Sequence, residues 1–399
     1  MTRSLDSRPP ARPGTAAPTA LRQRLAELRG PDVPARPLDA RALAALAANP
    51  GCRRRMLLDG AGIDKGALAR ALGAPASFGQ SQFALVRGHS FEQRAKADGG
   101  AALIRLLHER LGDGSPPPEP GSVDTPDLSA AGPEGRTART ALALREATAA
   151  GRWALLDHPL LALRIAGTPA YLEPDAVVVH PDGSWTVVEI KSFAMIDGTA
   201  DATKVGAAAR QAAVYVLALE EVAARMEDRP RVHARVLLVC PKDFSNLPAA
   251  ELVDVRKQLA TTRRQLGRLS RVEDIAAALP EGTTFDLCLT EDGRTATRPA
   301  GELLAAVECV EAAYAPECLA ACELAFHCRA RAREAGAVES LGRGLRGELG
   351  GLTTVESVLS AALGGAGDPE DPAVAALRRA AALRAEALAL AGTGTEAVA

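Results

Sequence analysis

Aromatic residues and excess charge are both scarce in this sequence. Phe, Trp and Tyr make up 3% of the 399 residues, and the formal net charge at pH 7 is −2. A protein that coats a DNA duplex is usually strongly basic, because the neutralisation of phosphate charge drives its binding. Any contact with nucleic acid must therefore come from local basic patches, or from a partner that delivers the substrate.

Long apolar segments are also missing. No apolar run reaches the roughly 18–20 residues that a membrane helix needs, and the first fifteen residues lack the apolar segment of a signal peptide. We therefore expect a cytoplasmic protein without a membrane partner. The seven cysteines are then not expected to form a disulfide framework, but to be buried, catalytic or bound to metal.

Several common catalytic signatures are absent as well. The sequence holds no phosphate-binding P-loop, no dinucleotide fingerprint and no recognisable Ser/His/Asp triad. Nothing in it therefore indicates an intrinsic ATPase or helicase activity.

What is present suffices for a large core, because 47% of the residues are hydrophobic. The length favours two or three units. We predict a disordered tail over 1–36 and a core over 37–336. Within the core, the Pro-, Gly- and Ser-rich stretch 112–135 is expected to be a flexible insertion. Residues 337–399 are rich in Ala and Leu and predict a helical extension.

Hydrophobic periodicity predicts an α/β fold, with a small mixed sheet flanked by helices. The predicted strands are 175–179, 185–191, 232–240 and 284–289. The predicted helical segments are 80–112, 136–165, 200–226, 249–278 and 300–334.

Two carboxylates and a lysine are placed together by the hairpin near residue 182. The Pro-Asp-Gly sequence at 181–183 suits a type I turn followed by a left-handed glycine, which makes a three-residue loop. Counting back from this loop puts Asp175 directly opposite Glu189. Lys191 is two residues further on, so it projects from the same face as Glu189.

This arrangement predicts a metal-dependent hydrolytic site. Two carboxylates facing each other across a strand pair repel, whereas a Mg²⁺ ion between them turns the repulsion into ligation. A lysine beside the metal can position the attacking water and offset phosphate charge. The alternative is an ordinary half-exposed hairpin edge that carries Glu and Lys as solvated residues.

The helix predicted over 200–226 adds two polar residues. Gln211 and Tyr215 are four residues apart and therefore share one helical face. Taken alone, the pair also fits an ordinary core tyrosine with a polar tip and a surface glutamine.

A Pro-Asp motif, a Glu-x-Lys motif and a helix with Gln-x-x-x-Tyr follow one another in the chain. This order resembles the RecB-like and Cas4-like branch of the PD-(D/E)xK nuclease superfamily. The resemblance implies a restriction-endonuclease-like core and a Mg²⁺- or Mn²⁺-dependent deoxyribonuclease. In that family scheme Asp175, Glu189 and the Ile190 carbonyl would bind metal, Lys191 would orient the water, and Gln211 and Tyr215 would contact DNA or support the lysine.

The resemblance also implies a further acidic residue or histidine on a helix before the hairpin. Arg-Gly-His-Ser-Phe-Glu at 87–92 supplies it. Glu92 stands four residues after Gly88 and fits the helix with Phe91 inward, so we favour Glu92 as the third metal ligand. His89 is the alternative.

Four cysteines form the second constellation. Cys318, Cys322 and Cys328 lie within eleven residues, and Cys52 stands alone far upstream. One cysteine before a nuclease core and three after it resemble the iron–sulfur staple of Cas4-like and AddB-like nucleases. This implies a [4Fe–4S] cluster, with Zn²⁺ as the alternative for four thiolates and His327 as a substitute ligand. The alternative interpretation is that the three nearby cysteines occur together by chance in an Ala-rich helix.

The remaining cysteines, Cys240, Cys288 and Cys309, are flanked by apolar residues and are expected in the core. Basic residues of 252–271 could follow a phosphate backbone or simply form a solvated face.

The expected partners are DNA, either single-stranded or as duplex ends, and a helicase or other subunit supplied in trans, in DNA repair or antiviral defence. A non-catalytic DNA-binding or scaffold subunit with the same fold is the alternative function.

Overall fold

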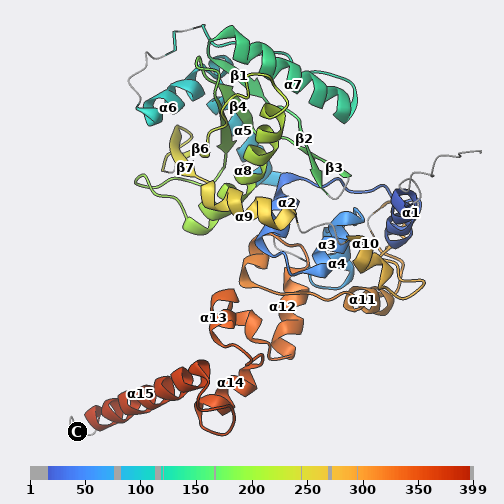
Figure 1. The fold of residues 1–399 in the computed structure, drawn as a ribbon, viewed down its shortest axis with the longest axis vertical. Coiled ribbons are helices and arrows are strands. Elements are labelled where there is room, and N and C mark those ends of the chain that lie inside the picture. The colour runs from blue at the N-terminus through green and yellow to red at the C-terminus, as the bar shows by residue number, and fades with distance from the viewer. Residues whose placement is uncertain are drawn as a thin grey trace, which may run out of the picture.

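A computed structural model gives the fold (Figure 1). It describes residues 17–75, 82–112, 118–119, 121–165, 168–243, 245–267, 272–293 and 295–395.

The centre of the protein is a five-stranded mixed sheet in the order β1-β4-β5-β6-β7. β5 and β6 are parallel and the other neighbouring pairs are antiparallel. A small mixed sheet flanked by helices is the predicted class. The strands are β1 (Ala154–Asp157), β4 (Ala176–Val179), β5 (Trp185–Ile190), β6 (Arg235–Pro241) and β7 (Pro248–Asp254).

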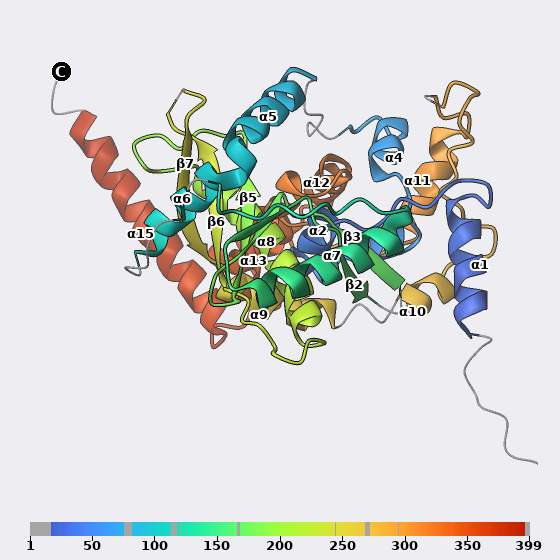
Figure 2. The same ribbon diagram turned by 90° about the horizontal axis from the view of Figure 1, so that it is seen from above.

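Helices cover both faces of this sheet, because alternate residues of each strand point to opposite sides. Val177 and Val187 belong to a core shared with α7 and α8. Val178 and Val188 belong to a second core shared with α5 and α6. Figure 2 shows α5 and α7 on opposite sides of the strands. These helices are α5 (Gln82–Ala95), α6 (Ala101–Leu111), α7 (Gly132–Ala150) and α8 (Ala202–Ala223).

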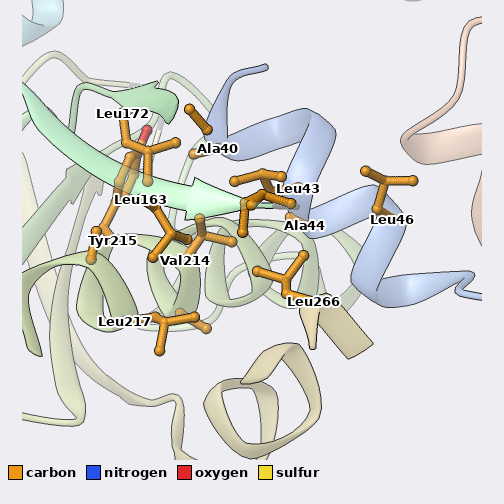
Figure 3. Close-up of a cluster of buried hydrophobic side chains, with 14 of the residues drawn as sticks. Ala40, Leu43, Ala44, Leu46, Leu163, Leu172, Val214, Tyr215, Leu217 and Leu266 are labelled. Atoms are coloured by element: carbon orange, nitrogen blue, oxygen red, sulfur yellow. The ribbon is translucent and has the colours of Figure 1, made fainter. Parts of the chain in front are cut away.

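The second helix, α2 (Ala40–Ala48), packs on α8 and on α9 (Arg256–Leu266). Its first turn is capped by Asp39, whose carboxylate accepts the Ala42 amide. Figure 3 shows its apolar side chains beside Val214 of α8 and Leu163 of the small hairpin. That hairpin consists of β2 (Leu161–Ile165) and β3 (Thr168–Leu172). α9 closes this core with Leu266.

The remaining helices lie beside and below the sheet in Figure 1. α15 extends away from the rest of the protein in both ribbon views. These elements are α1 (Ala17–Arg29), α3 (Arg53–Gly60), α4 (Lys65–Ala71), η1 (Asp98–Gly100), α10 (Val272–Ala277), α11 (Ala300–Glu308), η3 (Pro316–Ala320), α12 (Ala325–Glu334), η4 (Val338–Leu341), α13 (Arg343–Glu348), α14 (Val355–Ala362) and α15 (Pro372–Thr395).

The prediction of a disordered tail over 1–36 is wrong for the part that the structure describes. Ala17–Arg29 is helical, and Leu28 of this helix is fully buried. The Phe285 amide donates to the Leu28 carbonyl, so a distant segment holds the helix in place. The Pro- and Arg-rich composition of residues 1–36 gives no sign of this contact, because the contact is made with a segment that is distant in the sequence.

Three secondary-structure predictions also fail. Residues 154–165 form β1 and β2 rather than the end of a helix, and 249–254 form β7 rather than the start of one. Both segments are rich in Ala and Leu, which suit helices, and pairing with neighbouring strands overrides that preference. Residues 284–289 form no strand; Leu289 makes one isolated bridge to Ala296.

The predicted flexible insertion 112–135 is partly tied to the sheet. Asp124 pairs with β1, donating its amide to the Trp153 carbonyl and accepting from the Leu155 amide. The end of the stretch already belongs to α7, which begins at Gly132.

Among the described residues, no helix has both the length and the apolar character required to span a lipid bilayer.

Candidate catalytic site

The hairpin of β4 and β5 has the register that the turn predicts. Gly183 is left-handed, with φ of +80°, and its amide donates to the His180 carbonyl. His180 in turn pairs with Ser184 across a three-residue loop. The chain therefore turns where the Pro-Asp-Gly sequence indicates.

This register confirms that Asp175 lies opposite Glu189. β4 and β5 pair Ala176 with Val188, and one further step along the ladder reaches the two carboxylates. A single-residue slip would have sent them to opposite faces. The hairpin thus places both acids on the face of the sheet that α8 covers.

Glu189 is the most deeply buried acid of the group, with 1% of its side chain exposed. It forms an ion pair with Lys191 through Oε1, and neither carboxylate oxygen has any other hydrogen-bond donor within the described part of the chain. Burial raises the pKa of Glu189 to about 7; Lys191 opposes the shift and the charge of Asp175 adds to it. A buried carboxylate beside a second acid is costly even with one ammonium partner, so this position is suited to a bound cation.

Asp175 stands immediately before β4 and is held by the backbone of β5. Its Oδ2 atom accepts a hydrogen bond of 2.6 Å from the Ile190 amide. Burial raises the pKa of Asp175, while Lys191 and this hydrogen bond act in the opposite direction. The Ile190 carbonyl, the third group assigned to metal from the sequence, belongs to the same residue.

Lys191 follows β5 directly and continues its parallel pairing with β6. The Lys191 amide donates to the Val239 carbonyl at 2.9 Å, and a quarter of the side chain is exposed. Burial by itself lowers the pKa of Lys191, but the charges of Glu189 and Asp175 raise it above its ordinary value. Lys191 is therefore a cation held against two acids.

α5 approaches this end of the sheet from the other face. A Cβ atom at Gly88 would lie 3.9 Å from Ser192 Cβ, and Arg87 donates to the Ser192 carbonyl. The helix therefore passes close to the residue that follows Lys191. His89, on the same helix, is exposed.

Glu92 is the residue of α5 that reaches the carboxylate group. Its charge contributes to raising the pKa of both Asp175 and Glu189, so the three acids lie within electrostatic range. A hydrogen bond from His158, together with Lys96, lowers the pKa of Glu92 to about 2. Both partners contact the same oxygen, Oε1, at 2.9 and 2.6 Å.

Lys96 and His158 are site residues that the sequence analysis missed. Lys96 stands four residues after Glu92, so the helical spacing could have revealed it. His158 follows β1, in a segment predicted to be helical, and no sequence signal pointed to it. Its backbone is left-handed, with φ of +45°, which is rare for a residue with a side chain.

Gln211 and Tyr215 support the segment that leads to Asp175. Tyr215 is buried, and its hydroxyl donates to the Glu173 carbonyl at 3.1 Å and accepts from Gln211 at 2.9 Å. Burial raises the pKa of Tyr215, as does the charge of Glu189. The pair therefore tethers the chain two residues before Asp175.

A cavity of about 510 Å³ adjoins the site. Cationic side chains line it without any acidic one, and the ring of Phe193 contributes an aromatic wall. Lys204 lies over that ring, 5.9 Å from its centre. The cations are Arg41, Lys191, Lys204 and Arg210, and Gln211 completes the polar lining. This composition suits an anion with flat, stackable groups.

The two cysteine-bearing segments meet although 266 residues separate Cys52 from Cys318. Asn49 donates to the Ala313 carbonyl and to Cys318 Sγ, at 2.5 and 3.3 Å. Arg54 donates to the Val310 carbonyl and to Cys328 Sγ, at 3.1 and 3.3 Å. These contacts hold the start of α3 against the chain around α12.

All four cysteines of the predicted ligand set lie in this contact region. Burial raises the pKa of Cys328; Arg54 opposes the shift, and the neighbouring Cys52 and Cys318 add to it. Burial likewise raises the pKa of Cys322 to about 12, with a contribution from Cys328. Each of the four is therefore within electrostatic range of at least one other.

Across the described ranges, no group of three or more His, Cys, Asp or Glu side chains is arranged to hold a metal ion. His327, the substitute ligand, is buried, and its Nε2 atom has no hydrogen-bond partner.

The prediction that the other three cysteines are buried is only partly confirmed. Cys240 is buried, as expected, but Cys288 and Cys309 are exposed. Each lies at the surface of a short connection or helix end, where apolar neighbours in the sequence do not imply burial.

Two arginines of the basic segment 252–271 pair with nearby acids. Arg256 pairs with Asp254, and Arg263 pairs with Glu220 of α8. α9 turns Leu259 and Leu266 inward. Arg268 and Arg271 lie outside the described residues.

No protein-family model matches the chain, and no curated protein matches it.

Proposed function

We propose that this protein is a metal-dependent deoxyribonuclease of the PD-(D/E)xK type, in the RecB-like and Cas4-like branch. The observation that carries the proposal is the buried Glu189 carboxylate, which faces the Asp175 carboxylate and pairs with Lys191 but has no other hydrogen-bond donor among the described residues. One ammonium group does not neutralise two neighbouring buried carboxylates, so a purely structural sheet gains nothing from this pair. A divalent cation would offset the remaining negative charge.

The residues present fit Mg²⁺ or Mn²⁺. Asp175, Glu189 and the Ile190 carbonyl supply hard oxygen ligands, which these ions prefer. Glu92 offers a further carboxylate oxygen, since its two contacts both use Oε1. When bound, the cation polarises a phosphate oxygen and favours ionisation of water.

The chain's own side chains supply the rest of the chemistry. The Lys191 ammonium carries a positive charge beside both acids, where it orients the attacking water and offsets the charge that builds on the phosphate. Tyr215 and Gln211 hold the backbone before Asp175 and so fix the geometry of that ligand. The cationic cavity beside Lys191 admits the anionic strand.

We further propose that Cys52, Cys318, Cys322 and Cys328 hold a [4Fe–4S] cluster, with Zn²⁺ as the alternative. Two of the sulfurs already accept hydrogen bonds, from Asn49 and Arg54, and donors of this kind stabilise thiolate ligands. The cluster would join the two ends of the chain rather than act on the substrate. Since the sequence has no P-loop, we expect a helicase or other subunit to supply DNA in trans.

The test is a cleavage assay with the purified full-length chain on linear, circular and single-stranded DNA. Cleavage should require Mg²⁺ or Mn²⁺, stop with a chelator, and be lost in Glu189→Gln. The matched control is Glu251→Gln on β7, an exposed acid paired with Arg110, which should cleave like the wild type.

Metal-independent cleavage, or full activity in Glu189→Gln, would refute the proposal. DNA binding without cleavage under any metal would instead support a non-catalytic scaffold subunit.

A further inference from the structure

The ammonium group of Lys96 occupies a pocket that resembles a cation site. Its Nζ atom donates to Glu92 Oε1 at 2.6 Å, to Asp157 Oδ1 at 2.6 Å and to the Asp175 carbonyl at 2.7 Å. His158 Nε2 is a fourth neighbour at 3.1 Å. Only a tenth of the Lys96 side chain is exposed.

These neighbours come from three separate elements. Glu92 lies in α5 and Lys96 in the turn directly after it; Asp157 ends β1 and His158 follows it; Asp175 is the residue before β4. Three oxygens accept the three hydrogens of the ammonium, so its donors are fully used. Two carboxylates, a carbonyl and an imidazole gathered around one positive charge are also the ligand types of a divalent cation.

The backbone around this pocket is shaped to support it. His158 adopts its left-handed conformation, and its amide donates to the same Asp175 carbonyl, at 3.3 Å, that Lys96 contacts. Its ring reaches Glu92 Oε1 at 2.9 Å, and Arg136 donates to its carbonyl at 3.2 Å. Such a conformation persists only where the surroundings hold it, and it is most common at functional sites.

We propose that Lys96 is a tethered cation that fills the place of a second metal ion, so that the site binds a single divalent ion at Asp175 and Glu189. The inference rests on the proposed function for that first ion. Lys96 contacts Glu92 and the backbone carbonyl of Asp175, and its charge lowers the pKa of the Asp175 carboxyl, so it adjoins the proposed ion. In two-metal phosphodiesterases the second ion also lies beside the first. Lys96 is thus a positioning residue that supplies a permanent charge to the site.

The experiment counts Mn²⁺ ions bound by the DNA-free chain, from the loss of the free-ion electron paramagnetic resonance signal. The wild type should bind one ion at micromolar free Mn²⁺. Lys96→Met should bind two, because removal of the ammonium leaves both acids, the imidazole and the carbonyl without a cation. Lys96→Arg keeps the charge and should still bind one.

Two further variants test whether the second bound ion occupies the Lys96 pocket or results from a general change in the fold. Lys96→Met combined with Asp157→Asn should return to one ion, because a ligand of the new site is lost. Lys65→Met is the matched control: Lys65 pairs with the buried Asp59, which also pairs with Arg55, and its removal should leave the count at one.

The outcomes distinguish the two proposals. Two ions bound by the wild type, or an unchanged count in correctly folded Lys96→Met, would overturn the role of Lys96. If Lys96→Met does not fold, the wild-type count alone decides. A wild type that binds no ion, with Lys96→Met binding one, would refute the metal at Asp175 and Glu189 while supporting the tethered cation.

Discussion

The carboxylate–lysine group and the four cysteines are both proposed ligand sets, but they are assembled in opposite ways. Asp175, Glu189 and Lys191 lie within one hairpin, and a three-residue turn sets their relation. Cys52 reaches its partners only because α2 and α3 pack against a segment more than 250 residues later. We therefore expect changes in the first set to alter chemistry and changes in the second to alter the fold.

Among these variants Lys191→Ala should have the largest effect, and it should lower the rate of DNA cleavage rather than the stability of the fold. We expect cleavage to drop by about 10²–10⁴-fold, the range for loss of a positioned catalytic group. Binding of one Mn²⁺ should persist, because Asp175 and Glu189 remain. Rates under single-turnover conditions, measured beside a metal titration, check this; wild-type rates would remove Lys191 from the mechanism.

Cys328→Ser should give the converse pattern. If metal binding is coupled to folding, losing a ligand should lower the free energy of unfolding by several kcal/mol, on the order seen for structural metal sites. Activity should fall only as far as the folded fraction falls. Thermal unfolding and the iron and zinc content of anaerobically purified protein are the measurements.

Cys309→Ser is the control for this comparison, because Cys309 is exposed and outside the ligand set. Equal metal content in Cys328→Ser and the wild type would contradict the cluster.

Glu189→Gln should change how stability depends on pH in the metal-free protein. The folded pKa of about 7 is above the usual value for a glutamate, so the folded state binds more protons than the unfolded state between about pH 4.5 and 7. The contribution of Glu189 to stability is present below that window and is lost as the pH rises through it. The variant should therefore be more stable than the wild type at pH 8, by roughly 1–3 kcal/mol.

Urea unfolding at pH 5 and pH 8 with a chelator checks this prediction. If the free energies of unfolding of the variant and the wild type differ by the same amount at both pH values, then folding does not raise the pKa of Glu189. Added Mg²⁺ should stabilise the wild type alone.

Asn49→Ala should have the smallest effect. It removes hydrogen bonds to the Ala313 carbonyl and to Cys318 Sγ at a buried position. We expect a loss of about 1–2 kcal/mol, typical for leaving a buried acceptor unpaired. Unfolding by urea measures it, and a loss as large as that of Cys328→Ser would show that hydrogen bonds, not a metal, hold the two ends together.

The sequence alone determined those features of the fold and the site that depend on residues close together along the chain. The Pro-Asp-Gly turn and the alternation of strand residues set the register of Asp175 and Glu189, since backbone dihedral preferences act over a few residues. The tertiary structure decided what depends on distant partners. β1 and β7 became strands because strands were available to pair with them. The end of β1 then carried Asp157 and His158 to Lys96, a contact across 61 residues that no local pattern encodes. The cysteines obey the same rule: their spacing marked them as a set, but only the packing of α2 and α3 against the chain around α12 brings them together, because closing so long a loop requires a folded core to offset its entropy.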